Sequence, residues 1–352
     1  MIDRTLPLID LHRHLDGSVR LTTVLDLAAR HGLALPARDA AGLRPHVQIV
    51  TREASVMAFI ARFRWLREIM VDLDACRRIA RESVEDARHE GLDYVELRFS
   101  PWFMAERHGL DPAAVTEAVL DGIEEGARAT GLSANAIGIL SRTYGPEVAL
   151  RELEALLRCR GRLAAIDLAG DELLWPAAHF AWHFRRARDA GLAVTVHAGE
   201  ADGPESVWQA IGALGATRIG HAARVGEDPR LVDYMLEHRI GIEANLTSNV
   251  QTSTVPDYAH HPLRGWLERG LLATINTDDP AISAIDLPHE YEVAAPAAGL
   301  TPEQVRQAQA NALEIAFLPA EEKRALAARA AARGGRPAAS AGGAGSAPTD
   351  RR

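Results

Sequence analysis

Eight short apolar runs recur along the 352 residues of this chain, and stretches with helical spacing separate each run from the next. This alternation is typical of βα units that build a parallel sheet, and eight units are enough to close the sheet into a barrel. We therefore predict an α/β protein with a TIM-type (β/α)8 barrel. The predicted strands are residues 7–14, 94–100, 135–141, 164–170, 193–198, 217–221, 241–247 and 272–278.

The connection after the first predicted strand is much longer than the others. Residues 17–91 hold about three helical segments instead of one, and these extra helices would cover the mouth of the barrel. Barrels of this type need about 250 residues or more, so residues 1–333 are predicted to form a single catalytic domain. Residues 334–352 are rich in Gly, Ala, Ser and Pro without apolar periodicity, which predicts a flexible tail.

Composition excludes several classes of partner. The formal net charge is −9 and the basic residues are scattered, so no basic stripe is available for a nucleic-acid backbone. The sequence has neither a signal-peptide pattern nor an apolar run of membrane-spanning length, so no membrane association is expected. No protein partner is indicated. Cys76 and Cys159 are far apart, which favours a protein of the reducing cytoplasm.

Polar side chains stand at the ends of the predicted strands, and in such a barrel these ends face one shared mouth. His12 and His14 are two residues apart, so a strand places both imidazoles on one face, where they can hold one cation. His197 and Asp278 end two other strands and complete a ligand set that suits zinc, with a position left for water. Taken alone, the His-x-His pair has an alternative interpretation as a surface motif that binds nothing.

Two further residues at strand ends have the chemistry to move protons. His221 is predicted to accept or orient a proton of water near the metal, or else to be a buried neutral histidine bonded to the backbone. Glu200, three residues after His197, is a candidate general acid if the pocket is dry enough to keep it protonated. Its alternative is an exposed acid at the start of a helix. Asp278 and Asp279 are adjacent on the last strand, so one can bind metal while the other meets a ligand.

The other ten of the 14 histidines lie on predicted helices or loops, where solvation or capping explains them. His179 and His183 have a metal-compatible i, i+4 spacing but no glutamate between them, so we interpret them as packed or surface residues. His260 and His261, before Pro262, are interpreted as a loop that enters a helix.

A series of short motifs, spread over the chain in a fixed order, resembles the motif series of the adenosine deaminase family in the metallo-dependent hydrolase superfamily. The likeness runs from the first residues to about Lys323 and is strongest to the prokaryotic form of the family. Only the Gly/Ala-rich segment at the end falls outside it. The motifs are LHRHLDG, DLAGDE, VTVHAGE, IGHA, LTSN and NTDDP.

The resemblance implies that a zinc-bound water attacks the purine carbon that bears the amino group of adenosine. The products would be inosine and ammonia, and 2'-deoxyadenosine would be a further substrate. His221 would help to activate the water, and Glu200 would protonate the ring nitrogen next to the attacked carbon. One zinc ion per chain is implied, with the ligands His12, His14, His197 and Asp278.

The same resemblance implies contacts to the rest of the substrate. Asp279 would hold the nitrogen of the five-membered ring, and the backbone of Gly170 would meet the remaining ring nitrogen. Asp16 and His14 would lie near the ribose hydroxyl. One residue departs from the family pattern: Ala222 stands where glycine is expected, and its added methyl group would narrow the pocket.

Three related substrates are alternatives for the same reaction: free adenine, a methylated adenine nucleotide and a ribose-modified adenosine. The carboxylate of Asp16 opposes a phosphate, which disfavours the nucleotide. A metal-dependent phosphoesterase would require cationic phosphate contacts, for which Arg98 and Arg142 are the candidates. An inactive binding protein is disfavoured because the acid, the base and the ligand set are all present.

Overall fold

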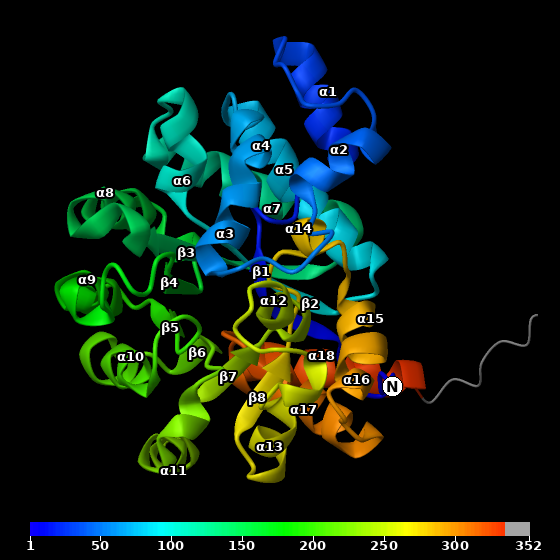
Figure 1. Ribbon diagram of the computed structural model, residues 1–352, viewed down its shortest axis with the longest axis vertical. Coiled ribbons are helices and arrows are strands. Elements are labelled where there is room, and N and C mark those ends of the chain that lie inside the picture. Colours follow the sequence, from blue (N-terminus) through cyan, green and yellow to red (C-terminus); the bar gives the residue numbers. More distant parts are fainter. Residues whose placement is uncertain (335–352) are drawn as a thin grey trace, which may run out of the picture.

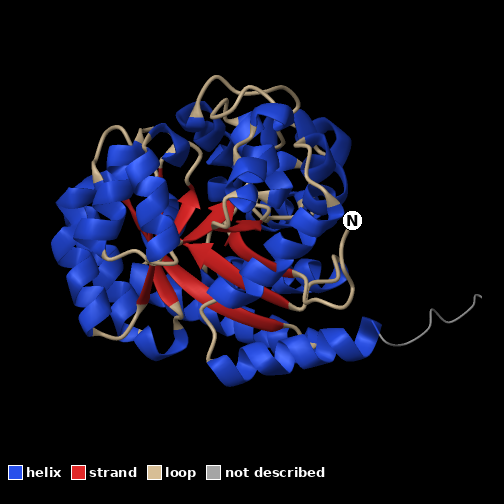
Figure 2. Cartoon of the chain, turned by 90° about the horizontal axis from the view of Figure 1, so that it is seen from below, coloured by secondary structure: helices blue, strands red, loops and turns tan. Residues whose placement is uncertain are grey.

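A computed structural model describes residues 1–334 of the chain and confirms the predicted barrel. The strands are parallel and follow the order of the sequence around one eight-stranded sheet. Helices surround the strands (Figure 1), and the sheet lies inside this helical shell (Figure 2). The strands are β1 (Ile9–His14), β2 (Tyr94–Phe99), β3 (Ser133–Ser141), β4 (Ala165–Ala169), β5 (Ala193–Ala198), β6 (Arg218–His221), β7 (Gly241–Ala244) and β8 (Leu272–Ile275).

The register of neighbouring strands separates an outer row of apolar side chains from an inner polar row. Successive residues of a strand point to opposite faces of the sheet. One row of paired residues, fully or almost fully buried, is therefore apolar and packs toward the helices: Val196, Ile219, Ile242 and Ala273. The adjacent row points into the barrel and consists of His197, Gly220, Glu243 and Thr274.

The barrel closes between β1 and the segment that follows β8. An isolated parallel bridge pairs Arg13 with Asp278. The N–H of His14 donates to the carbonyl of Asp278 at 2.7 Å, and the N–H of Asp278 donates to the carbonyl of His12 at 2.8 Å. This seam therefore joins two segments that lie more than 260 residues apart in the sequence.

Two predicted strands, residues 241–247 and 272–278, each end three residues earlier than expected, so the predictions for their last residues are wrong. β7 stops at Ala244 because the residues after Asn245 wind into a helix, α12 (Leu246–Gln251). β8 stops at Ile275, and Asp278 has a φ of 65°. This left-handed conformation does not occur within a regular strand. Asp278 and Asp279 therefore lie beyond β8 rather than on it.

Five α-helices fill the connection between β1 and β2, where about three were predicted. They are α1 (Leu21–His31), α2 (Ala40–Val47), α3 (Val56–Ile60), α4 (Arg64–Glu68) and α5 (Leu73–His89), and a short 3-10 turn at Ala61–Phe63 joins α3 to α4. Phe59, Ile60 and Phe63 of this region line the cavity at the barrel mouth. The extra helices therefore cover the site, as the sequence predicts.

Local signals in the sequence set the ends of the other helices. Thr301 begins α17 (Pro302–Ile315) with a capping box, in which its hydroxyl accepts from the N–H of Gln304 and its own N–H donates to the Gln304 side chain. The remaining helices are α6 (Pro101–Ala105), α7 (Pro112–Thr130), α8 (Gly145–Arg158), α9 (Ala181–Asp189), α10 (Pro204–Gln209), α11 (Pro229–Glu237), α13 (Leu263–Glu268), α14 (Pro280–Ser283), α15 (Leu287–His289), α16 (Ala295–Ala297) and α18 (Ala320–Gly334).

None of the helices within residues 1–334 combines the length and the apolar character that a membrane crossing requires. The predicted flexible tail at 334–352 lies outside the described residues except for Gly334, which ends α18.

Candidate active site

A cavity of about 810 Å³ opens at the carboxyl ends of the strands. Its volume falls within the range of about 300–1,000 Å³ that is usual for small-molecule sites. Every predicted site residue lines it except His12, which is fully buried. The predicted residues in its wall are His14, Asp16, Gly170, His197, Glu200, His221, Asp278 and Asp279.

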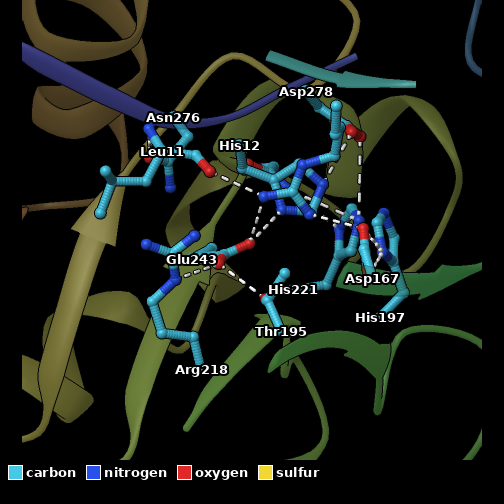
Figure 3. Close-up of polar contacts among 12 residues, drawn as sticks. Leu11, His12, Asp167, Thr195, His197, Arg218, His221, Glu243, Asn276 and Asp278 are labelled. Atoms are coloured by element: carbon cyan, nitrogen blue, oxygen red, sulfur yellow. Dashed lines mark hydrogen bonds and ion pairs between the residues drawn. The ribbon is translucent and has the colours of Figure 1, made fainter. Parts of the chain in front are cut away.

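The four predicted zinc ligands meet at the floor of the cavity. The Nε2 atoms of His14 and His197 are 3.1 Å apart. Asp278 Oδ1 lies 3.2 Å from Nε2 of His12 and 3.4 Å from Nε2 of His14. Figure 3 shows the rings of His12 and His197 converging with the Asp278 carboxylate. Residues from β1, β5 and the turn after β8 are thus brought to one point.

Buried carboxylates fix which ring nitrogens face this point. His12 Nδ1 donates to Glu243 Oε2 at 2.7 Å, and His197 Nδ1 donates to Asp167 Oδ1 at 3.1 Å. A carboxylate only accepts, so each Nδ1 carries a proton, and Nε2 is the nitrogen of both rings that is left to face the cluster. His12 Nε2 makes no hydrogen bond within the described residues, although it is fully buried. Carboxylates that orient ring nitrogens in this way are the usual outer partners of metal-bound histidines, so these residues fit a bound metal ion.

Glu243 is the centre of a fully buried charge network that supports His12. Its carboxylate accepts hydrogen bonds from Arg98 at 2.7 Å. It also accepts from Arg218 at 2.6 Å and from Thr195 at 2.7 Å, as Figure 3 shows. Burial alone would raise the pKa of Glu243, but the two guanidinium groups hold it well below its usual value. Glu243 therefore stays ionised and acts only as an acceptor. Glu243 was not predicted from the sequence, although a charged residue inside an apolar strand was a usable signal.

Two overlapping sets of side chains can supply the metal ligands. The Nε2 and carboxylate contacts described above join His14 to His197 and Asp278. A second set replaces His14 by His221, because one ligand atom from each of its members lies within 4.8 Å of the others. The members of this second set are His12, His197, His221 and Asp278. Geometry alone leaves His14 and His221 as alternative fourth ligands.

Glu200 lines the same cavity, and its surroundings keep its carboxyl group protonated. Burial raises the pKa of Glu200 well above its usual value, and the nearby charges of Asp278 and Glu172 raise it further. Glu200 Oε1 lies 3.6 Å from Nδ1 of His221, which is too long for a hydrogen bond. A neutral carboxyl group in this position can donate a proton to a ligand in the cavity.

Glu172 holds the loop that carries Glu200, and the sequence analysis assigned it no role. Its buried carboxylate accepts backbone N–H groups of Gly199 at 2.6 Å, Glu200 at 3.1 Å, Ala201 at 2.7 Å and Asp202 at 3.0 Å. Four donors on one carboxylate fix the conformation of this turn. In the sequence, an acid in a loop looks like any solvated residue, so nothing in the pattern singled it out.

The predicted substrate-binding residues line the wall of the cavity. Asp16 Oδ1 and Asp279 Oδ1 are buried and have no hydrogen-bond partner within residues 1–334, so both are available to a ligand. Burial raises the pKa of Asp16 to about 7. Burial and the charges of Asp278 and Asp16 raise that of Asp279 well above its usual value. Gly170 has a φ of 109° and leaves no room for a side chain beside Thr143, which favours glycine there.

Backbone strain is concentrated beside the site. His221, Ala222 and Asp278 have φ values of 64°, 55° and 65°, a region that side chains other than glycine rarely adopt. Ala222 is fully buried and is not among the cavity-lining residues of the described chain. Its methyl group therefore does not narrow the pocket, and the departure from glycine instead costs backbone strain.

The structure also places the other histidines that the sequence singled out and the two arginines considered for phosphate binding. His183 is buried and bonded to the Pro146 carbonyl at 3.0 Å, and His179 is exposed, so both are packed or surface residues as predicted. His261 is buried rather than solvated, and its Nδ1 accepts the N–H of Leu263 at the start of α13, in line with the predicted capping and the predicted entry into a helix. Arg98 and Arg142 are buried, bonded to Asp167 and to the His197 carbonyl respectively, and do not line the cavity. They offer no cationic contact for a phosphate.

The family model and the curated relatives place the chain in one family. Residues 7–332 match the family model described as adenosine deaminase. An adenosine deaminase of Vibrio cholerae is 57% identical over 334 residues, which cover 95% of this chain and 100% of that protein. A zinc-bound amidohydrolase from Burkholderia ambifaria is similar with a TM-score of 0.84 and 26% identity, covering 94% of this chain and 91% of the other. An adenine deaminase from Arthrobacter aurescens, at 24% identity, has the same fold with a TM-score of 0.86, covering 92% of this chain and 98% of that one.

Proposed function

The chain belongs to the adenosine deaminase family and hydrolyses adenosine to inosine and ammonia, and from this premise we propose that the reaction uses one zinc ion per chain. The proposal also covers 2'-deoxyadenosine as a substrate. We assign four residues as the zinc ligands: His12, His14, His197 and Asp278.

One observation carries the assignment of the metal. Buried carboxylates occupy the Nδ1 atoms of His12 and His197, so Nε2 of each ring is left for a metal ion beside Asp278. Imidazole nitrogen with carboxylate oxygen is a ligand set that zinc prefers. A bound zinc ion acidifies water to a pKa of about 7 and so supplies a nucleophile at neutral pH.

The proposed roles of the other residues follow from their protonation and position. Glu200 is held neutral by burial, and it donates its proton to the purine ring nitrogen next to the carbon that is attacked. This proton transfer prevents negative charge from building up on the ring as water adds. Asp279 binds the nitrogen of the five-membered ring, for which its raised pKa provides a proton to donate. His221 lies beside Glu200 and orients or accepts a proton of the attacking water.

The sugar end of the substrate is assigned to the acidic wall of the cavity. His14 and Asp16 are proposed to lie near the ribose hydroxyl, and the backbone of Gly170 to meet the remaining ring nitrogen. Asp16 and Asp279 would repel a phosphate whenever they are ionised, which disfavours a nucleotide substrate. The proposed reaction thus involves a small nucleoside, without a nucleic acid or a protein partner.

A reducing compartment such as the cytoplasm is proposed as the place of action. Cys76 and Cys159 are both free thiols, which is the usual state of cysteines in reducing compartments.

The decisive experiment measures zinc content and deamination together. The purified protein is assayed spectrophotometrically with adenosine, deoxyadenosine, adenine and AMP, and its metal is quantified. We expect one zinc ion per chain and turnover of the two nucleosides. His12→Ala is expected to lose zinc and activity, whereas His179→Ala, at an exposed histidine, is expected to keep both.

Different results would contradict different parts of the proposal. Full zinc content in His12→Ala would show that the ligands are misassigned. Faster turnover of adenine or AMP than of adenosine would refute the substrate assignment.

A further inference from the structure

A chain of hydrogen bonds runs from the backbone at the start of α13 to the imidazole of His221. The N–H of Leu263 lies 3.2 Å from His261 Nδ1, His261 Nε2 lies 3.1 Å from Asn249 Oδ1, and Asn249 Nδ2 lies 3.0 Å from His221 Nδ1. All four residues are fully or almost fully buried. We propose that Asn249 and His261 are positioning residues that keep the proton of His221 on Nε2, so that His221 orients the attacking water as a donor.

The backbone N–H of Leu263 sets the donor-to-acceptor direction of this series of hydrogen bonds. An amide N–H can only donate, so Nδ1 of His261 must accept from Leu263. Burial lowers the pKa of His261 to about 3, which keeps the ring neutral with a single proton. That proton is therefore on Nε2, and His261 donates it to Asn249.

The side-chain amide of Asn249 transmits the same donor-to-acceptor direction to His221. Because the donor is His261 Nε2, the atom that faces it must be the amide oxygen, and the NH2 group must face His221. An NH2 group has no acceptor capacity, so Nδ1 of His221 accepts. A neutral imidazole carries one proton, which leaves Nε2 of His221 as an N–H donor toward the cavity.

Other neighbours of His221 do not oppose this assignment. The Asn245 side chain lies 3.3 Å from Nδ1 and 3.4 Å from Nε2, so it favours neither nitrogen. Glu200 Oε1 is 3.6 Å from Nδ1, beyond hydrogen-bond distance. The carboxylate of Asp278 lies 3.9 Å from Nε2, on the side that the N–H faces.

A proton on Nε2 has two consequences for His221, one for metal binding and one for proton transfer. An Nε2 that carries hydrogen has no lone pair for a metal, which favours His14 over His221 as the fourth ligand. It also cannot accept the proton of the attacking water at that nitrogen. This inference rests on the proposed function only for the water that His221 orients. The position of the proton itself follows from hydrogen bonds between residues of the protein.

The position of the proton can be measured directly by NMR. The zinc-loaded protein is labelled with 15N at histidine, and long-range 1H–15N spectra separate pyridine-type from pyrrole-type nitrogens. The His221 signals are identified by their loss in His221→Gln. We expect a pyridine-type Nδ1 and a pyrrole-type Nε2 in the unmodified protein.

Asn249→Asp is the matching variant, because it is nearly isosteric and reverses the demand on His221. A carboxylate only accepts, so His261 can still donate to it, but His221 must now donate from Nδ1. We expect the two nitrogen types to exchange and turnover to fall by about 10²–10³-fold, as when an oriented donor is lost, with zinc content unchanged. Gln251→Glu adds the same charge to α12 outside this chain of bonds, and it is expected to keep the spectrum of His221.

A pyrrole-type Nδ1 in the unmodified protein would overturn the proposal, as would an Asn249→Asp spectrum identical to the original. If Asn249→Asp does not fold, the unmodified spectrum and that of Asn249→Ala, expected to show a mixture of the two tautomers, take its place. Failure of the proposed function is separate, because it would appear as missing zinc or missing turnover in the unmodified protein.

Discussion

The carboxylate of Glu172 accepts the backbone N–H of Glu200, with 3.1 Å between Oε2 and the nitrogen. The same carboxylate binds the N–H groups on either side, at Gly199 and Ala201. The acid that we propose as the proton donor thus sits on a turn that is held by a second acid. The position of Glu200 and its protonation both depend on Glu172, because the charge of Glu172 also raises the pKa of Glu200.

The first prediction concerns this support. In Glu172→Gln, an NH2 group replaces one of the accepting oxygens and faces backbone donors, which leaves buried N–H groups without a partner. Such groups cost about 1–3 kcal/mol each, so we expect a loss of stability of this order and lower turnover, with zinc retained. Urea unfolding and steady-state rates measure both effects. Glu205→Gln, at an exposed acid just beyond the turn, serves as the control, and an equal loss there would contradict the prediction.

The second prediction concerns the pH dependence of turnover. An acid catalyst works in its protonated form, and burial raises the pKa of Glu200 well above its usual value. On the alkaline side, turnover should therefore fall tenfold for each pH unit above this pKa. In Glu200→Gln, the rate should drop by about 10²–10⁴-fold and this alkaline decline should disappear, while zinc stays bound. Near-normal turnover of the variant would exclude Glu200 as the acid.

A third prediction uses the complementarity of the site to the transition state. A purine ribonucleoside with a tetrahedral, hydroxylated carbon at the reacting position should bind about 10²-fold or more tightly than adenosine. Inhibition constants measure this ratio. The advantage should shrink in Glu200→Gln, because the lost proton donor meets the ring only as water adds. Equal affinities in the unmodified protein would argue against hydrolytic attack.

The fourth prediction concerns stability and involves a residue outside the cavity. Glu290 is fully buried, its carboxylate accepts the N–H of Thr247 at 3.3 Å, and burial raises its pKa from 4.5 to about 8. A raised pKa in the folded state means that the stability it contributes is complete below about pH 4.5 and is lost as the pH rises to about 8. Between pH 5 and 8 this loss is on the order of 4 kcal/mol.

Replacement by Gln tests this linkage. Glu290→Gln cannot ionise, so its free energy of unfolding should decline less over that range than that of the unmodified protein. Urea unfolding at both pH values measures the difference. Glu292→Gln changes an exposed acid on the same turn and should keep the original pH dependence. Parallel pH profiles of Glu290→Gln and the unmodified protein would disprove the raised pKa.

The barrel was predictable from the sequence because the alternation of apolar runs and helical patterns is a long-range property of the whole chain. The ends of its strands and helices were less predictable. In the segment that begins at Gly241, the strand and α12 are joined at Asn245 without proline or glycine, so the apolar pattern alone placed the strand end three residues too late. Only the packing of the folded chain determines where that helix begins.

Residues to which we propose direct chemical roles were easier to find than those that support them. His197 and Glu200 fall at a strand end, where their type is informative. Glu172 and His261 lie in loops that the sequence shows as ordinary polar segments, and their importance arises from partners that are distant in the sequence, such as Asn249 for His261. Strain at Ala222 was equally invisible, since only the backbone angle reveals it.

The seam between β1 and Asp278 has a consequence for synthesis. The residue that closes the barrel by its backbone is also one of the proposed ligands, and it lies in the last quarter of the chain. A nascent polypeptide still attached to the ribosome with residue 278 in the exit tunnel lacks both the closing bridge and that carboxylate. Closure of the barrel and completion of the proposed ligand set therefore both wait for the same late segment of the chain.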